Sequence, residues 1–248
     1  ICFIKNKRIL GLNFTTSRPA KIILKIFFNN YVFRDENYAN EFNKKTFKLY
    51  QNLYFDILGK LNFKINTKQN QFNLDEKYRT TFENFHANEI KKNYYLFHID
   101  ERWDSFNKEI YQKTLRILNC MAKKNKIVIT TGIKDFSFLC ELEKKFLCYD
   151  YINNEFFKKN IVNINNAIIV LKKMPLNLLA YFIKNSDKNF SAHSGPVVHI
   201  GAAFNKEIID IVEKDKNNEL DRWIPVVSNY KRFNFENLNN DFIENFNF

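Results

Sequence analysis

From Tyr94 onward, short apolar runs alternate with longer amphipathic segments, and this alternation constrains the fold more than any other feature of the chain. Tyr94–Ile99 (YYLFHI) is apolar at most positions, and Lys126–Thr131 (KIVITT) is apolar at its centre, which is typical of strands that are buried on both faces. The segments between such runs carry apolar residues at helical spacing. Strands that alternate with helices in this way predict a parallel, doubly wound α/β sheet.

The expected strands of this part are 94–99, 126–131, 167–171, 189–192 and 208–212, and the expected helices are 108–123, 136–146, 175–185 and 196–205. Trp223 and Pro225 are expected in a loop, and Phe235–Phe246 is expected to form a closing helix. Because the carboxyl ends of parallel strands meet at one edge, we expect ligands to bind at that edge.

The first part of the chain is expected to end another α/β unit. Arg8–Phe14 is a strand-like run, and apolar residues at helical spacing predict helices over Ala20–Phe28 and Asn40–Leu58. The chain begins at Ile1, on an apolar segment and without Met, so we expect it to be a fragment whose true start is missing.

A polar stretch, Asn62–Asn93, separates the two parts and shows no clear periodicity. We expect an irregular connection there, with one short helix near Glu76–Asn84. Two domains are expected. Residues 1–90 hold the remnant of a first Rossmann-like domain and the connection, and residues 91–248 form a second Rossmann-like domain with a closing C-terminal helix. A surface loop within a single domain is the competing interpretation.

The charge balance favours an anionic partner. Lys and Arg outnumber Asp and Glu by 39 to 27, which gives a net charge of +12 and a pI near 9.4. The excess is spread along the chain, so no specific nucleic-acid site is expected. The four Cys and four His residues lack metal-ligand spacing, so no metal is expected either. Cysteine usage favours a reduced, cytoplasmic setting, and no apolar run is long enough to span a membrane.

The stretch Ser191–Val212 combines small residues, a helix start and a polar cluster. Ser194 is expected to cap the helix and Pro196 to lie in its first turn. Free backbone N–H groups near Ser194, Gly195 and Val197 would then favour a phosphate group. An ordinary turn between a strand and a helix remains the alternative.

The residues that follow four of the expected strands gather, in this prediction, at one edge of the sheet. They are Asp100, Glu101, Arg102 and Trp103; Thr131, Gly132 and Asp135; Lys172, Lys173 and Met174; and His193, Ser194 and Gly195. Hydroxyl and basic groups in this set suit a phosphate, and Met174 could form an apolar wall against a purine. His199 is either a core histidine or a ligand contact. The pair Asp100 and Glu101 could act in acid–base catalysis, cap a helix or lie in solvent.

The run Val170–Phe204 resembles the donor-binding half of glycosyltransferase family 9, the heptosyltransferases of lipopolysaccharide core synthesis and their relatives. A Lys-Met-Ser-Leu-like turn is matched by Lys173, Met174 and Leu176, and a later Ser-Gly…His…Ala-Ala motif by Ser194, Gly195, His199, Ala202 and Ala203. HIDERW (98–103) and ITTG (129–132) resemble two strand-end loops of the family. His193 stands where the family carries an acidic residue, one extra residue precedes His199, and Glu101 stands where a Lys is usual.

The resemblance implies the GT-B architecture, in which two Rossmann-like domains face each other and the second holds a nucleotide-diphosphate-sugar. It implies transfer of a heptose-like sugar to a cell-envelope glycan, lipid-linked glycan or lipopolysaccharide acceptor, without a metal or further cofactor. Asp100, Glu101, Arg102, Thr131, Gly132, Lys173, Met174, His193, Ser194, Gly195 and His199 would bind the donor. The catalytic base usually comes from the first domain, and none is named here. The protein would act in the cytoplasm, with peripheral association at the inner face of the membrane.

Two other interpretations stay open. The chain could be a non-catalytic Rossmann-like module that binds a nucleotide or RNA, or a degenerate transferase retained as an interaction partner. A pocket that recognises a nucleoside diphosphate and a surface that recognises RNA differ in the salt dependence of binding.

Overall fold

The computed structural model describes residues 10–13, 30–33, 72–99, 108–132, 134–159, 167–192, 195–214, 224–225 and 229–237. The chain divides into two compact units, Ile1–Thr67 and Lys68–Phe248. In the first unit, β1 (Leu10–Asn13) pairs in parallel with β2 (Asn30–Phe33). β1 lies within the expected strand, β2 was not expected, and the expected helices 20–28 and 40–58 lie outside the described residues.

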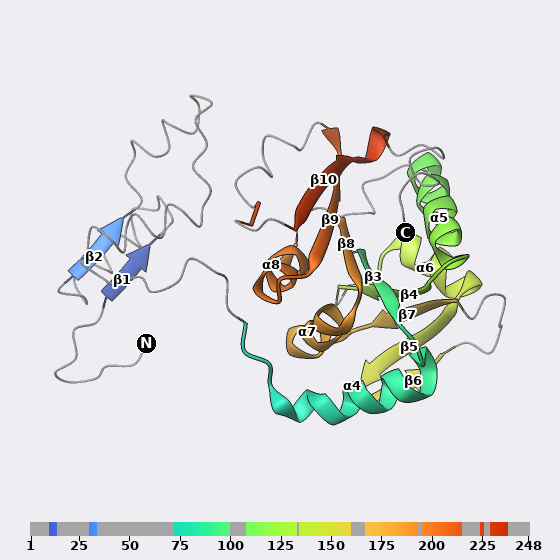
Figure 1. The fold of residues 1–248 in the computed structure, drawn as a ribbon, viewed down its shortest axis with the longest axis horizontal. Coiled ribbons are helices and arrows are strands. Elements are labelled where there is room, and N and C mark those ends of the chain that lie inside the picture. Colours follow the sequence, from blue (N-terminus) through green and yellow to red (C-terminus); the bar gives the residue numbers. More distant parts are fainter. Residues whose placement is uncertain are drawn as a thin grey trace. The chain divides into compact units, whose positions relative to one another are not determined.

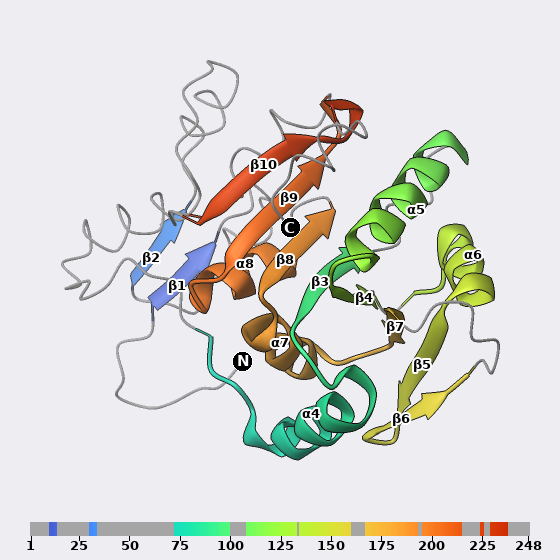
Figure 2. The same cartoon turned by 45° about the vertical axis from the view of Figure 1, so that its right-hand side comes forward.

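The second unit is built on an eight-stranded sheet with the strand order β10-β9-β8-β3-β4-β7-β5-β6 (Figures 1 and 2). Every neighbouring pair is parallel except β5 with β6, which is antiparallel. The strands are β3 (Tyr94–Ile99), β4 (Lys126–Thr131), β5 (Leu147–Ile152), β6 (Glu155–Lys158), β7 (Ile168–Lys172), β8 (Lys188–Ala192), β9 (Glu207–Val212) and β10 (Tyr230–Asn234). The predicted doubly wound α/β class is therefore confirmed.

Helices cover both faces of this sheet. The main helices are α4 (Arg79–Phe85), α5 (Lys108–Ala122), α6 (Ser137–Lys145), α7 (Leu176–Asn185) and α8 (Pro196–Ala203). Successive side chains of a strand point to opposite faces. Phe97 accordingly belongs to the cluster that contains residues of α5 and α6, whereas its neighbour Leu96 belongs to the cluster that contains residues of α4, α7 and α8. The two faces are called below the α5–α6 face and the α7–α8 face.

A continuous helical segment, residues 76–90, includes the short helix expected near Glu76–Asn84 and extends beyond it. It consists of the 3₁₀ helix η1 (Glu76–Tyr78), α4 and the π-helical turn η2 (His86–Ile90). Phe82 and Phe85 on α4 are buried, and the ring of Phe82 lies 5.0 Å from that of Phe182 on α7. This packing agrees with the place of the segment in the second unit, which begins at Lys68.

Two further elements were not expected. β5 and β6 form a hairpin whose turn residues, Asn153 and Asn154, have φ values of 50° and 68°, as in a type I′ turn. β10 extends the sheet at its other end. The expected closing helix at 235–246 begins instead as the 3₁₀ helix η6 (Phe235–Asn237), and the residues after it lie outside the described ones.

Helix α8 lies close to the sheet, as its small residues predict. A Cβ atom added at Gly201 would lie only 3.0 Å from Cγ1 of the buried Ile208 on β9. The absent side chain therefore allows this close approach. Across the described residues, no helix combines the length and the apolar character that a membrane span requires.

Candidate functional site

The strand order reverses between β3 and β8. From β3 the chain continues through α5 to β4 on one side, whereas β8 lies on the other side of β3 and continues through α8 to β9 (Figure 2). The two helices cover opposite faces of the sheet. Ligands of doubly wound sheets bind in the crevice at the carboxyl ends of the strands where such a reversal occurs. The carboxyl ends of β3 and β8 therefore define the candidate site.

The two loops that the sequence analysis singled out follow these two strands. Asp100, Glu101 and Arg102 come directly after Ile99, the last residue of β3, and His193, Ser194 and Gly195 come after Ala192, the last residue of β8. Of these six, only Gly195 is among the described residues. The register places His98 on β3 opposite Ser191 on β8, so both loops start at the same level of adjacent strands.

The start of α8 differs in detail from the prediction. Gly195, not Ser194, is the N-cap, with φ −85° and ψ −166°, and this residue has no side chain that could cap the helix. Pro196 has no N–H group, and the Val198 N–H donates to the Gly195 carbonyl oxygen at 3.1 Å. At most the N–H groups of Gly195 and Val197 are thus left for a ligand, and both residues are buried in this structure. The positive end of the helix dipole still favours an anion at this position.

His199 lies one turn into α8 and is half-buried. Burial lowers its pKa, and the negative charge of Asp210 opposes that shift only in part. The imidazole is therefore mainly neutral at pH 7 and can both donate and accept a hydrogen bond.

Asp210 on β9 is fully buried on the α7–α8 face and anchors a polar group that the sequence analysis missed. The Tyr230 hydroxyl donates to Asp210 Oδ2 at 2.6 Å, and Arg232 Nε lies 3.4 Å from the same oxygen. Arg232 Nε also donates to the Tyr230 hydroxyl at 2.9 Å. Burial and the adjacent carboxylate raise the pKa of Tyr230, so its hydroxyl stays protonated and remains a donor.

The strand register extends this group into a polar row across five strands. Arg232, Asp210, Ser191, His98 and Thr130 occupy paired positions on β10, β9, β8, β3 and β4. His98 Nδ1 lies 2.9 Å from Thr130 Oγ1. Ser191 is fully buried, and its hydroxyl has no hydrogen-bond partner among the described residues. A partial sequence signal was present, because β3, β4, β8 and β9 each carry a polar residue in their carboxyl-terminal half.

The turn after β7 contains two lysines in different environments. Lys172 is 2% exposed, and its Nζ contacts Glu143 and lies 3.0 Å from Asp135. Burial alone would lower the pKa of Lys172, but the hydrogen bonds to Glu143 and Asp135 outweigh burial and raise it. Lys173 has a left-handed φ of 60°, and its Nζ lies 3.0 Å from Asp150. Lys172 is therefore engaged in buried ion pairs, whereas Lys173 is partly exposed.

The remaining predicted residues at this edge are mostly internal. Met174 is 6% exposed and packs in the core of the α7–α8 face, so it does not form an open wall in this structure. Thr131 is buried, and its hydroxyl donates to the Gly132 carbonyl oxygen at 3.2 Å. Gly132 is half-buried. Among the residues that the structure describes, no three His, Cys, Asp or Glu side chains gather in a way that could hold a metal ion.

Comparison with known proteins yields one structural match. No family model and no curated protein matches the chain. Among solved structures, it resembles the crystal structure of the glycosyl transferase family 9 from Veillonella parvula DSM 2008, with a TM-score of 0.58 and 14% sequence identity. The match covers 86% of this chain and 53% of that one, so the chain spans about half the length of the solved protein. At this identity the likeness shows a shared fold.

Proposed function

We propose that the chain is the donor-binding part of a glycosyltransferase that uses a nucleotide-diphosphate-sugar. The observation that carries this proposal is the place of α8: its uncapped N-terminus follows β8 at the reversal of strand order, beside the carboxyl end of β3. The family 9 fold of the matched structure supports the same assignment. The resemblance of the Lys173 turn and of the Ser194–Gly195 segment to that family adds a sequence argument.

The proposed donor contacts come from the loops after four strands. They are Asp100, Glu101 and Arg102 after β3; Thr131 and Gly132 after β4; Lys173 and Met174 after β7; and His193, Ser194, Gly195 and His199 after β8. The N–H groups of Gly195 and Val197 would hold the diphosphate. Lys173 would add a positive charge, and neutral His199 would donate a hydrogen bond.

These groups would stabilise the leaving group. Sugar transfer breaks the bond between the anomeric carbon and a diphosphate oxygen, and the electron pair stays on that oxygen. A helix N-terminus and a lysine aimed at the developing charge stabilise the transition state more than the ground state. The acceptor oxygen takes the sugar and loses its proton to a base that is not assigned here.

The acceptor and the location are also proposals. A heptose-like sugar and a cell-envelope glycan or lipid-linked acceptor follow from the family resemblance. The net charge of +12 would favour peripheral association with an anionic membrane surface. We propose the inner face of the cytoplasmic membrane as that surface.

The test compares Gly195→Asp with Gly195→Asn by calorimetric titration with ADP, UDP and GDP. The φ of −85° at Gly195 suits any residue, and Asp and Asn are equally good N-caps, so the two variants differ in one charge. Two like charges about 4 Å apart, such as a carboxylate and a phosphate, repel each other by about 4 kcal/mol at an effective dielectric constant of 20. After screening, we expect Gly195→Asp to weaken binding of a nucleoside diphosphate at least about tenfold relative to Gly195→Asn.

Equal affinities of the two variants would contradict the proposed phosphate position. A different outcome would favour the nucleic-acid alternative. In that case the chain binds RNA tightly, loses that affinity steeply as the salt concentration rises, and does not bind a nucleoside diphosphate.

A further inference from the structure

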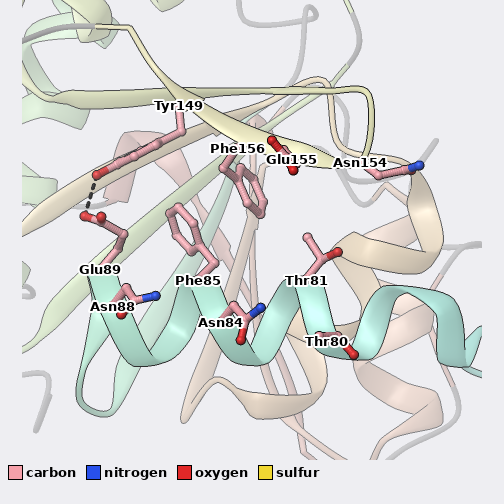
Figure 3. A pocket seen from close by; sticks show the side chains of 10 residues that line it. All are labelled: Thr80, Thr81, Asn84, Phe85, Asn88, Glu89, Tyr149, Asn154, Glu155 and Phe156. Carbon is pink, nitrogen blue, oxygen red and sulfur yellow. Dashed lines mark hydrogen bonds between the residues drawn. The ribbon is translucent and has the colours of Figure 1, made fainter.

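A groove lies between α4–η2 and the β5–β6 hairpin, on residues that the proposed donor site does not use (Figure 3). Its volume is about 370 Å³, within the range of small-molecule sites. The lining residues are Thr80, Thr81, Asn84, Phe85, Asn88, Glu89, Tyr149, Asn154, Glu155 and Phe156. None of them is among the proposed donor contacts.

The helical wall presents two rows of side chains. Thr80, Asn84 and Asn88 follow one another at a spacing of four residues, and so do Thr81, Phe85 and Glu89, which places each row along one side of the helix. This wall ends in the π-helical turn η2. The N–H group of Lys91 donates a hydrogen bond to the His86 carbonyl oxygen, five residues earlier, at 2.7 Å. π-helical turns are rare and occur frequently at functional sites.

Aromatic rings form the floor of the groove. The rings of Phe85 and Phe156 lie 4.2 Å apart at an angle of 43°, and Tyr149 meets Phe85 edge-on at 5.0 Å (Figure 3). The Tyr149 hydroxyl donates to Glu89 Oε2 at 2.5 Å, so the tyrosine holds this carboxylate at one end of the groove. Phe156 is half-buried and offers the accessible part of the apolar surface.

The polar lining is rich in groups that both donate and accept hydrogen bonds. The amides of Asn84, Asn88 and Asn154 have this property, as do the two threonine hydroxyls. No Lys or Arg lines the groove within the part of the chain that the structure describes, although the whole chain carries 39 of them. An anionic ligand would thus meet the carboxylates of Glu89 and Glu155 without a compensating cation.

We propose that this groove binds a neutral saccharide, with the ring of Phe156 against the apolar face of a pyranose. A sugar hydroxyl both donates and accepts, which matches the asparagine and threonine lining. The C–H face of a pyranose matches an aromatic floor. A pocket with an aromatic base and a few converging polar groups is the usual form of a small-molecule site. The proposal does not depend on the donor-binding function, because it concerns different residues.

The test measures binding of neutral trisaccharides to the intact chain by saturation-transfer NMR. The probes are maltotriose, cellotriose, mannotriose and chitotriose, with spermidine as a cationic comparison and sucrose octasulfate as an anionic one. We expect at least one trisaccharide to bind more tightly than spermidine. Phe156→Ala should leave any binding of sucrose octasulfate unchanged, because that anion is attracted to basic groups outside the groove. We also expect Phe156→Ala to weaken its affinity at least about fivefold.

The chain offers matched controls for both walls. Phe157 is the next residue of β6, is 48% exposed and points to the other side of the hairpin, so Phe157→Ala should leave saccharide affinity unchanged. Asn84→Ala removes an exposed side chain and should weaken binding without disturbing the fold, whereas the exposed Asn73 lies outside the groove and Asn73→Ala should have no effect.

Three results would overturn the proposal. They are no binding by any of the four trisaccharides, tighter binding of spermidine than of every trisaccharide, and unchanged saccharide affinity in both Phe156→Ala and Asn84→Ala. Nucleotide titration of the same samples reports on the donor site separately, so failure of one proposal leaves the other to be judged on its own measurement.

Discussion

Lys172 and Lys173 are adjacent in sequence, yet the structure gives them separate roles that a pair of substitutions can distinguish. Lys172 Nζ contacts Glu143 and lies 3.0 Å from Asp135 and 3.9 Å from Asp150, with the Lys172 side chain 3% exposed. Breaking a buried ion pair by removing one partner costs about 3–5 kcal/mol. Lys159 and Lys173 stay 3.0 Å from Glu143 and Asp150 in a Lys172→Met variant, so the expected loss is lower, about 2–3 kcal/mol.

Lys173→Met is the matched control. The Lys173 side chain is 39% exposed, and an exposed ion pair contributes at most about 1 kcal/mol. Methionine replaces the unbranched stem of either lysine without its ammonium group, so the two variants differ mainly in how deeply the lost charge is buried. Urea unfolding followed by circular dichroism gives both free-energy differences. We expect Lys172→Met to unfold at a clearly lower urea concentration than Lys173→Met, and Lys173→Met to weaken nucleoside diphosphate binding. Equal stability of the two variants would refute the structural role assigned to Lys172.

The other predictions concern pH and the environment of His199. Burial acts to raise the pKa of Glu143, but its hydrogen bonds to Lys172 and Lys159 leave that pKa below the usual value. The stability that these ion pairs contribute is therefore complete above about pH 5 and is lost as the pH falls through the lowered pKa of Glu143. The urea midpoint of the native chain should fall more steeply over that range than that of Glu143→Gln, and parallel curves would contradict this assignment. For His199, NMR titration of the imidazole should give a pKa below 6.5, and Asp210→Asn should lower it further because the Asp210 charge raises it. An unchanged titration in that variant would show that the two side chains do not interact.

The sheet could be predicted well where strands are apolar on both faces. Tyr94–Ile99 and Lys126–Thr131 begin and end where the sequence analysis placed them, because the first is a nearly continuous apolar run and the second has an apolar, β-branched centre. β10 was missed because it lies at the end of the sheet, and its sequence, YKRFN, contains two basic residues. Edge strands carry less apolar character, so the pattern that marks a central strand is weak there.

The β5–β6 hairpin was missed for a different reason. β5 starts at Leu147, only two residues after α6 ends at Lys145, so its apolar start is continuous with the helical pattern. The Asn153–Asn154 turn also lacks the glycine that makes a hairpin turn conspicuous. The groove of Figure 3, which this hairpin helps to form, could not be anticipated without it.

The candidate site was predictable in location more than in detail. Residues after parallel strands meet at one edge in any such sheet, and Gly195 at the start of α8 lies there. The burial of Lys172 could not be foreseen, because its partners Asp135, Glu143 and Asp150 lie on three other segments of the chain. Whether the predicted residues contact a donor stays a prediction.

The most direct measurement is the backbone amide NMR signal of Gly195 and Val197 during titration with the nucleoside diphosphate that binds best. We expect these two signals to shift strongly at saturation, because their N–H groups donate to the diphosphate, while the signals of Asn84 and Phe156 in the separate groove do not move. Saturable binding that leaves the amides of Gly195 and Val197 unchanged would show that the start of α8 does not hold the phosphates.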